Sequence, residues 1–293
     1  MERFMILLIT GLALGCIYGL VALGYSLIYK ASGLMSLMQG DIMTLGAYLG
    51  LTFYAFMGIP FALSLVLTIA VAFLFGILME KGIIRTLTRR GVGVAYIVLA
   101  TIAISYIIQN GVNLIWGNIP LSFPSVFAVN TVRVAGVNIQ PEVLVAVGVS
   151  LLLMIALHFF MTKTRVGTSM RAAAMDSKAA EACGIDTSLS TGITWGLSAG
   201  IAAVGGMLIG PMYGVFSLLG AQLGRKGFAG AVIGGFGNMY GAMVGGIALG
   251  LLENFVAGYI SSQFRDLVAY MVLLLFLFIK PTGIFNERAI QDG

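Results

Sequence analysis

Apolar residues fill most of this chain in long runs, and short polar stretches separate one run from the next. A helix that crosses the hydrocarbon core of a bilayer needs about 20 predominantly apolar residues. Several runs in the first part of the chain have about this length. We predict spanning helices over residues 5–29, 33–57, 61–79, 91–115, 143–161 and 189–209.

The last third of the chain has no comparably clean runs, because glycine interrupts it repeatedly. The pair Gly210-Pro211 is predicted to break the sixth helix, since proline removes a backbone donor. Residues 228–235 are too few to cross about 30 Å at about 1.5 Å per residue, and a turn-like stretch follows at 236–241. We predict a half-helix that enters from outside, turns within the membrane and continues as a fuller helix over 242–260.

These elements define an all-α polytopic membrane protein with about eight transmembrane segments, the last at residues 267–280, and a re-entrant or broken helix in the C-terminal third. No internal repeat or separate soluble domain is evident, so we expect one transmembrane domain over residues 1–293. Composition agrees, because 59% of the residues are hydrophobic and 9% are charged, with a mean hydropathy of +1.03. A soluble domain carries about 25% charged residues.

The basic residues lie between the apolar runs, where they act as orientation signals and do not indicate a nucleic-acid partner. Residues 80–90 and 162–187 each carry four Lys or Arg side chains, so both segments are predicted to be cytoplasmic. Residues 116–142 contain a single cation, Arg133, and are predicted to face outward. Counting back along the spans places the amino terminus outside, whereas Arg3 favours the opposite side.

The segment 162–187 has the pattern of a short docking helix on the cytoplasmic side. It is rich in alanine, which favours helix, over about residues 168–183. Gly184 is placed to end this helix in a left-handed conformation. Asp186 is a good N-cap for the span that follows.

Asp41 lies inside the second predicted span, where a carboxylate costs at least about 2.5–3.5 kcal/mol on insertion scales. One interpretation is that it faces a partner or a cavity. The other, compatible with the first, is that Gly40 breaks the helix and Asp41 caps its second half. The pair at 253–254 is a second intramembrane polar site, for which we favour a structural hydrogen-bonding role. A polar cluster ends the fourth span, namely Gln109, Asn110 and Asn113. It is explained by a solvated helix end, by an entrance or by a contact with an extracellular partner.

Glycines recur four residues apart along several predicted helices. Small residues at this spacing let helix backbones approach closely in a membrane. Helix packing is therefore the interpretation that we favour for Gly11, Gly15 and Gly19, and for the pairs Gly230/Gly234, Gly241/Gly245 and Gly246/Gly250.

The enzyme motifs that occur in this sequence are incomplete, so the chain is predicted not to be an enzyme. Ser198 lies in a Gly-x-Ser-x-Gly pattern, but the lone histidine, His158, precedes it and sits in a span, whereas a nucleophile elbow needs a later histidine. The two cysteines have no metal-ligand spacing, so no metal site is predicted. The phosphate-binding pattern GxxxxGK[ST] does not occur. If ATP drives this protein, another subunit hydrolyses it.

Several motifs, in order along nearly the whole chain, resemble those of the LivH-type permeases of branched-chain amino acid ABC importers. They are residues 15–24 (GCIYGLVALG), 27–33 (LIYKASG), 40–41 (GD), 45–48 (LGAY), 164–165 with 171–172, 180 and 184–185, 234–246, and 281–284 (PTGI). One motif departs from the family pattern. Where the family commonly has Asn-Phe-Ala-His/Gln-Gly, residues 36–40 read SLMQG, so only Gln39 and Gly40 are retained.

The resemblance implies a permease subunit of an ATP-driven importer, working by alternating access in the cell (inner or cytoplasmic) membrane. Its substrates would be branched-chain or other hydrophobic amino acids, with amides and urea in some branches. The implied partners are a second permease subunit (LivM-type, or a second copy), two cytoplasmic ATPase subunits, an extracellular solute-binding protein and membrane lipid. No cofactor is expected in this chain, and ATP and Mg would bind the partner ATPases.

The resemblance and the polar pattern together select two groups of candidate residues. Those expected to couple the chain to the ATPases are Arg165, Arg171, Ala172, Asp176, Ala180, Glu181, Gly184 and Ile185. Those expected along a translocation path are Gln39, Gly40, Asp41, Tyr48, Gly235, Gly237 and Asn238. The rival hypothesis is an ATP-independent channel or facilitator for small polar solutes, which would need no ATPase partner.

Overall fold

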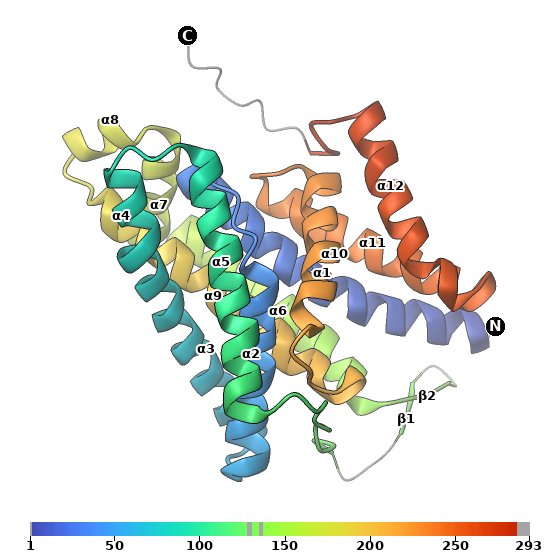
Figure 1. Cartoon of the computed structure of the whole chain (residues 1–293). Helices are drawn as coiled ribbons and strands as arrows, with labels where there is room; N and C mark the ends of the chain where they lie inside the picture. The colour runs from blue at the N-terminus through green and yellow to red at the C-terminus, as the bar shows by residue number, and fades with distance from the viewer. Residues whose placement is uncertain (1, 128–130, 135–136, 286–293) are drawn as a thin grey trace.

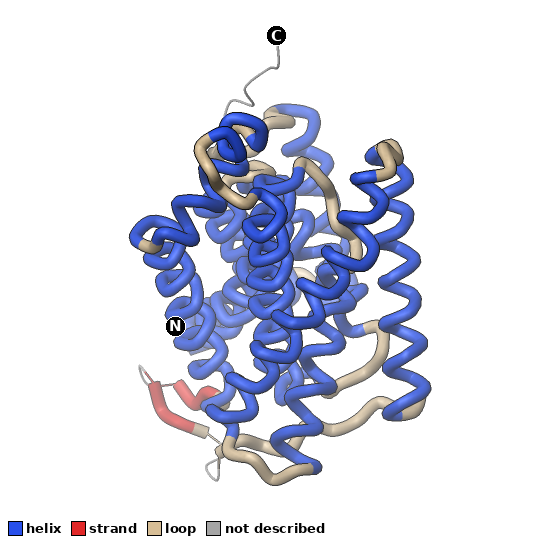
Figure 2. The backbone as a smooth tube through the Cα atoms, turned by 90° about the vertical axis from the view of Figure 1, so that its left-hand side faces the viewer, coloured by secondary structure: helices blue, strands red, loops and turns tan. Residues whose placement is uncertain are grey.

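The computed structural model describes residues 2–127, 131–134 and 137–285, and these form a bundle of helices with one small hairpin (Figures 1 and 2). In chain order the elements are α1 (Glu2–Ser32), α2 (Gln39–Leu51), the π-helical turn η1 (Thr52–Phe56), α3 (Phe61–Met79), the π-helical turn η2 (Glu80–Ile84), α4 (Arg85–Arg89), α5 (Val94–Trp116), β1 (Val132–Val134), β2 (Val137–Ile139), α6 (Pro141–Lys163), α7 (Arg165–Met175), α8 (Ser177–Ala182), α9 (Thr187–Tyr213), α10 (Leu219–Gly234), α11 (Met239–Tyr259), the 3-10 turn η3 (Ser262–Phe264) and α12 (Arg265–Ile279).

The bundle has two ends with different chemistry. At the basic end lie α4, α7 and α8, which Figure 1 shows together, and the guanidinium of Arg85 donates to the carbonyl of Ser188 at 2.6 Å there. At the opposite end, which we call the hairpin end, lie the antiparallel strands β1 and β2 and the connection from α5 to α6. The two basic segments thus share one end of the molecule, as a common membrane side requires.

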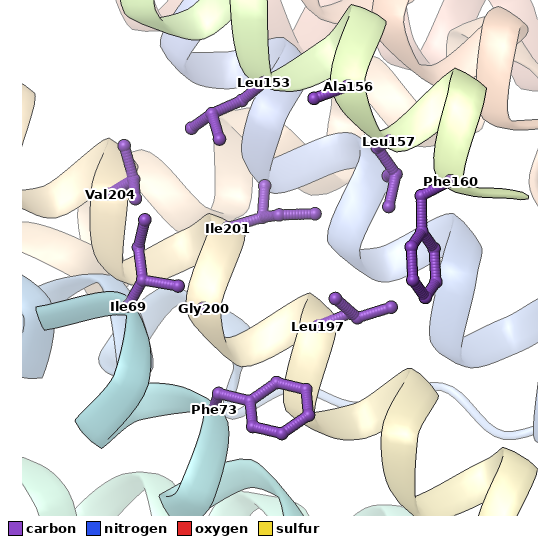
Figure 3. Close-up of a pocket in the computed structure, with 10 residues that line it drawn as sticks. All are labelled: Ile69, Phe73, Leu153, Ala156, Leu157, Phe160, Leu197, Gly200, Ile201 and Val204. Atoms are coloured by element: carbon purple, nitrogen blue, oxygen red, sulfur yellow. The ribbon is translucent and has the colours of Figure 1, made fainter. Parts of the chain in front are cut away.

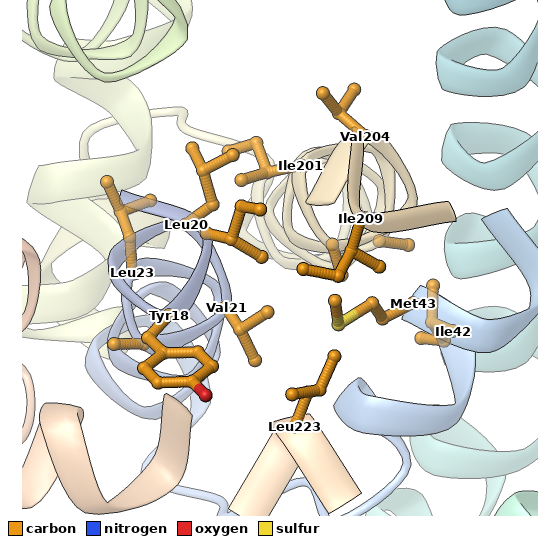
Figure 4. Close-up of a cluster of buried hydrophobic side chains, with 14 of the residues drawn as sticks. Tyr18, Leu20, Val21, Leu23, Ile42, Met43, Ile201, Val204, Ile209 and Leu223 are labelled. Carbon is orange, nitrogen blue, oxygen red and sulfur yellow. The ribbon is translucent and has the colours of Figure 1, made fainter. Parts of the chain in front are cut away.

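Helices α1 and α9 form the centre of the bundle, and most of their residues are buried. Their apolar side chains meet those of α2 and α10 in one continuous cluster (Figure 4). By contrast, α3, α5 and α12 turn large apolar side chains outward, as helices in contact with lipid or with another membrane subunit do.

Glycines allow α1, α11 and α10 to pack with their backbones in contact. A Cβ atom added at Gly15 would lie 2.6 Å from the carbonyl oxygen of Ile247, and one added at Gly230 would lie 2.7 Å from the Cα of Gly246. A Cβ at Gly246 would itself meet the backbone of Gly19 on α1. The packing interpretation of the glycine spacing is therefore confirmed for these helices.

The predicted all-α polytopic class is confirmed, but the count of about eight spans is not. Among the described residues, seven helices are long and apolar enough to cross a membrane. They are Glu2–Ser32, Phe61–Arg89, Val94–Trp116, Pro141–Lys163, Thr187–Tyr213, Met239–Tyr259 and Ser262–Ile279. The remaining long helices, α2 and α10, have 13 and 16 residues and begin inside the bundle.

The prediction of a continuous second span over 33–57 is wrong. Gly33, with a φ of +66°, ends α1, and the chain forms no regular helix before Gln39. The hydroxyl of Thr101 on α5 accepts the free backbone N–H of Leu37 at 3.1 Å. A hydropathy pattern does not detect this break, because the non-helical residues are as apolar as the helices beside them.

The re-entrant helix predicted in the C-terminal third is not confirmed, and the helices there are interrupted elsewhere than predicted. Helix α9 continues through Pro211 and ends at Gly214, whose φ is +75°. Residues 215–218 then lead back into the bundle, where α10 begins. The predicted turn at 236–241 overlaps the short connection from α10 to α11. This connection lies beside the segment after α12, as the hydrogen bond from the N–H of Ile284 to the carbonyl of Ile233 shows.

The two broken helices begin beside each other and run in opposite directions. In Figure 1, α2 runs toward the hairpin end and α10 toward the basic end. The backbone N–H of Gly220 in α10 donates to the hydroxyl of Thr44 in α2 at 2.8 Å. A similar sequence pattern precedes each helix, GLMSLM at 33–38 and GVFSLL at 214–219. The structure thus shows an internal correspondence that is not evident from the sequence alone.

Two smaller expectations also change. The basic segment at 80–90, which the charge pattern and the end of the third predicted span at residue 79 indicate to be a loop, is mostly helical and continues α3 through η2 into α4. The predicted single helix over about 168–183 is two helices, because the side chain of Asp176 caps α8 by accepting the backbone N–H of Ala179. The left-handed cap at Gly184 is confirmed by its φ of +81°, and the N-cap at Asp186 by its bond from Leu189 N–H.

The backbone contact between α1 and α11 generates a stability prediction. Gly246→Ala inserts a methyl group where the backbone of Gly19 lies, so the helices must separate, at a cost of about 1–3 kcal/mol. We expect a lower melting temperature for the detergent-purified protein. Gly148→Ala on α6 is the matched control, since no atom lies within 4 Å of its added Cβ. Equal melting temperatures for the two variants would contradict the packing role.

Candidate functional site

The starts of α2 and α10 border a cavity of about 590 Å³, whose other walls come from α1, α5 and α12. Most of its lining is apolar, and its charged side chains are Asp41 and Arg225. A cavity of this size falls in the range of small-molecule sites, about 300–1,000 Å³. Its position is the one at which non-helical backbone is tolerated at membrane depth, beside a protein-lined cavity.

Asp41 forms the acidic wall of this cavity together with two side chains of α5. Its carboxylate accepts a hydrogen bond from the hydroxyl of Ser105 and another, at 2.8 Å, from the amide of Gln109. The residue is 2% exposed and lies in the first turn of α2, where the helix dipole favours a negative charge.

Of the two interpretations of Asp41, a residue facing a cavity and a cap for the second half of the helix, the structure favours the first. The helix does begin at this point, as the capping interpretation requires. However, the donors to Asp41 in the described part of the chain are side chains of α5, not backbone N–H groups of α2. Asp41 is therefore a cavity residue and not a cap. Gln109, for which a solvated helix end, an entrance or an extracellular contact was predicted, also lines the cavity.

Arg225 forms the basic wall and was not among the predicted site residues. It lies on α10 and is exposed to the cavity, and its Nε donates to the carbonyl of Ala221 at 3.0 Å. The first turn of α10 carries no acidic residue, and its N-cap, Leu218, provides no side-chain acceptor. Positive potential from the helix dipole thus adds to the charge of Arg225 on this wall. The signal in the sequence was an arginine inside a glycine-rich, otherwise apolar stretch.

Apolar and aromatic side chains make up much of the remaining lining. The rings of Tyr25 and Phe228 meet edge to face, with their centroids 5.5 Å apart, and both line the cavity. Ile102 on α5 and Leu273 on α12 complete this surface. The cavity therefore offers a negative group, a positive group and an apolar surface to one small molecule.

A second cavity, of about 270 Å³, lies between α3, α6 and α9 (Figure 3). Figure 3 shows side chains such as Phe73, Leu157 and Leu197 pointing into it from these three helices. No charged or polar side chain lines it. It lacks the polar groups that orient a ligand, so we assign the candidate site to the first cavity.

The residue next to Arg225, Lys226, belongs to an ion cluster around the buried carboxylate of Glu253. Its ammonium contacts Glu253 on α11, and it lies 2.7 Å from a carboxylate oxygen of Asp266 on α12. The guanidinium of Arg265 reaches the same Glu253 at 2.5 Å. These ion pairs join α10, α11 and α12.

The neighbouring Asn254 has the predicted hydrogen-bonding role. Its amide donates to the carbonyl of Leu7 at 2.6 Å and to the hydroxyl of Thr10 at 2.7 Å, so it ties α11 to α1. The structural interpretation of the pair at 253–254 is confirmed for these contacts.

The structure brings together only part of the predicted path. Gly40 and Asp41 line the cavity, and Gln39 lies behind them, fully buried, with its amide donating to the carbonyl of Ser198 at 2.9 Å. Tyr48 lies away from the cavity and packs on Trp116, with ring centroids 5.3 Å apart. The remaining predicted residues, Gly235, Gly237 and Asn238, form the connection between α10 and α11, where Asn238 caps α11.

The predicted coupling residues lie together at the basic end, on α7, α8 and the turn after α8. Arg165, Arg171 and Glu181 are exposed, and Glu181 accepts a hydrogen bond from the hydroxyl of Thr187 at 2.5 Å. Asp176 caps α8 and Ala180 is buried beneath it. The others are the partly buried Ala172 and Ile185 and the exposed Gly184. Sequence reasoning missed Met175, which is 75% exposed at the end of α7.

A bundle of membrane-spanning helices, with two half-helices that border a charged cavity, defines the class of this protein as a multi-pass membrane transport protein. The family described as "Branched-chain amino acid transport system / permease component" matches residues 7–277. The chain belongs to this family, which confirms the resemblance to LivH-type permeases and the location in the cell membrane.

Three relatives cover nearly the whole chain. The "High-affinity branched-chain amino acid transport system permease protein LivH" of Escherichia coli (strain K12) is 32% identical, over 96% of this chain and 95% of its own length. The corresponding protein BraD of Pseudomonas aeruginosa is also 32% identical, over 97% of this chain and 96% of its own. A "Probable branched-chain amino acid transport permease protein LivH" of Methanocaldococcus jannaschii is 26% identical, over 90% and 87%.

Among solved structures, "PsaBC from Streptococcus pneumoniae in complex with Fab" contains a chain of similar fold. The TM-score is 0.51 and the sequence identity is 18%, over 96% of this chain and 93% of that one. At this identity the likeness concerns the arrangement of the helices alone.

The ion cluster generates a prediction that is separate from the cavity. Glu253→Ala leaves Lys226 and Arg265 without their shared buried carboxylate, and breaking a buried pair in this way costs about 3–5 kcal/mol. We expect a large fall in the melting temperature of the purified protein. Asp266→Asn, at a position 68% exposed, should change it little. The structural role would be refuted if the two variants melted alike.

Proposed function

We propose that this chain is the transmembrane permease subunit of an ATP-driven importer of branched-chain or other hydrophobic amino acids, working by alternating access. The observation that carries the proposal is the cavity lined by both Asp41 and Arg225, in a chain that belongs to a permease family over nearly its full length. The names of its relatives support the substrate class.

The energy source lies outside this chain. Its sequence contains no phosphate-binding loop, so two partner ATPase subunits with ATP and Mg would supply the work. The basic end carries the surface on which they would dock, namely α7 and α8 with Arg165, Arg171 and the exposed Met175. This end would then be cytoplasmic, as the positive-inside rule favours.

A second permease subunit would cover the open side of the cavity. The two helices α5 and α12, which contribute to the cavity, expose large apolar side chains, including Tyr106 at 61% and Met271 at 58% exposure. The partner would be a LivM-type chain or a second copy of this one. An extracellular solute-binding protein would meet the hairpin end, and lipid would cover the remaining apolar faces.

The rival, an ATP-independent channel or facilitator for small polar solutes, would also use a cavity at the start of broken helices. Family membership and the exposed helices at the basic end favour the importer. The test is uptake of radiolabelled L-leucine into proteoliposomes that contain this chain, the partner permease, the ATPases and the binding protein. Uptake that needs internal ATP supports the importer, and uptake by this chain without ATPases supports the facilitator.

Docking on α7 and α8 generates a prediction with its own control. Arg171→Ala or Met175→Ser should weaken retention of the ATPases on the purified permease and lower ATP-driven leucine uptake by about 10-fold, the loss expected for one good interfacial anchor. Arg133→Ala, which removes a cation at the hairpin end, should leave ATPase retention unchanged. Full retention in both α7 variants would refute the docking surface.

A further inference from the structure

We propose that the cavity binds an α-amino acid as its zwitterion, with the ammonium group at Asp41 and the carboxylate at Arg225. This inference rests on the proposed function and deepens it, because it assigns the two charges of the substrate to two residues of this chain. It also excludes uncharged solutes, such as amides or urea, as good ligands of the same site.

Asp41 has the remaining capacity that an ammonium group needs. An ionised carboxylate offers about four acceptor positions, and Ser105 and Gln109 supply one donor each. Both donors are neutral, and no salt bridge to Asp41 occurs in the part of the chain that the structure describes. An unpaired carboxylate at membrane depth is costly, and a cationic ligand in the cavity would remove that cost.

Arg225 has the corresponding capacity for a carboxylate. Its Nε is used by Ala221, while its two terminal nitrogens donate to no group in the described ranges of the chain. The planar fork of a guanidinium suits a carboxylate, with which it forms two parallel hydrogen bonds. The first turn of α10 is free of acidic residues, so the helix dipole adds positive potential at the start of this helix.

The neighbouring Lys226 differs from Arg225, because its charge is paired within the protein. Lys226 is buried and pairs with both Glu253 and Asp266, whereas Arg225, one residue earlier, forms no ion pair with either and interacts with Asp266 only at longer range. The difference follows from the helix, because the two residues point to different sides of α10. One side meets α11 and α12, and the other opens into the cavity. The unpaired charges are therefore those that a ligand in the cavity would reach.

The apolar part of the cavity fits the side chain of such a substrate. Tyr25, Phe228 and Leu273 line the same cavity as the two charged residues. The backbones of α2 and α10 touch at Gly40 and Gly224, the residues before Asp41 and Arg225, so the two charges start from neighbouring positions, as the two charged groups on one α-carbon require. A hydrophobic amino acid would place its ammonium at Asp41, its carboxylate at Arg225 and its side chain against the apolar surface. The same two charges would suit a polar amino acid equally, so the apolar surface provides the preference among amino acids.

The experiment measures equilibrium binding to the assembled transporter in lipid nanodiscs, without the solute-binding protein. The probe is radiolabelled L-leucine. The competitors are 3-methylbutylamine, which lacks the carboxylate of leucine, and 4-methylpentanoate, which lacks its ammonium group. In the wild type we expect leucine to bind about 10- to 100-fold more tightly than either competitor, because each loses one charge-assisted contact.

The variants should remove these differences selectively. Arg225→Gln should weaken the binding of leucine to that of 3-methylbutylamine and leave the binding of the amine unchanged. Asp41→Asn should weaken the binding of leucine to that of 4-methylpentanoate and should not weaken the binding of that anion. Gln222→Ala, an exposed residue of α10 that does not line the cavity, is the matched control and should bind leucine as the wild type does.

Three results would overturn the site: no saturable leucine binding by the wild type, an equal loss for leucine and the truncated ligands in each variant, or variants that fail only to assemble with the second permease. The last result would mean that the two charges pair with that subunit. Failure here is distinct from failure of the proposed function, because wild-type ATP-driven leucine uptake would remain. Loss of that uptake with all partners present would refute the proposed function itself.

Discussion

The hydrogen bond from the backbone N–H of Gly220 to the hydroxyl of Thr44 is the contact on which the arrangement of this protein depends. A helix that starts inside a bundle leaves its first N–H groups without partners, and in a membrane each such group costs several kcal/mol. Here one broken helix supplies the acceptor for the other. A Cβ on Gly40 or Gly220 would overlap the opposing backbone, so the close approach also requires glycine at this crossing.

The crossing also determines where charge is placed. Because α2 and α10 start beside each other and run apart, their first turns border the same cavity and their later turns pack on different helices. Asp41 and Arg225 therefore line one space. Charges that do not line the cavity, such as Glu253, are neutralised within the protein instead. The protein thus contains paired charges that hold helices together and unpaired charges that remain available to a ligand or a partner subunit.

Much of the fold could be predicted, and the errors have one cause. The long spans were found because apolar length is a local property, and Asp41 was found because a carboxylate in an apolar run is conspicuous. The break at 33–38 was missed because its residues are apolar, while Thr101, far away in the sequence, accepts the exposed N–H of Leu37. Arg225 was missed because its significance depends on which face of α10 it occupies, and that depends on the packing of α11 and α12.

The sequence by itself determined that a bilayer surrounds the protein, that its class is helical, that the two basic segments share one end, and which family it belongs to, because these properties follow from composition, run length, loop charge and ordered motifs. Only the tertiary structure decided where helices break, which glycines touch and which charges share a cavity. The physical reason is that a backbone group or a charge in a membrane must find a partner, and that partner is usually distant in the sequence. Thr44 with Gly220, and Asp41 with Ser105, are such pairs.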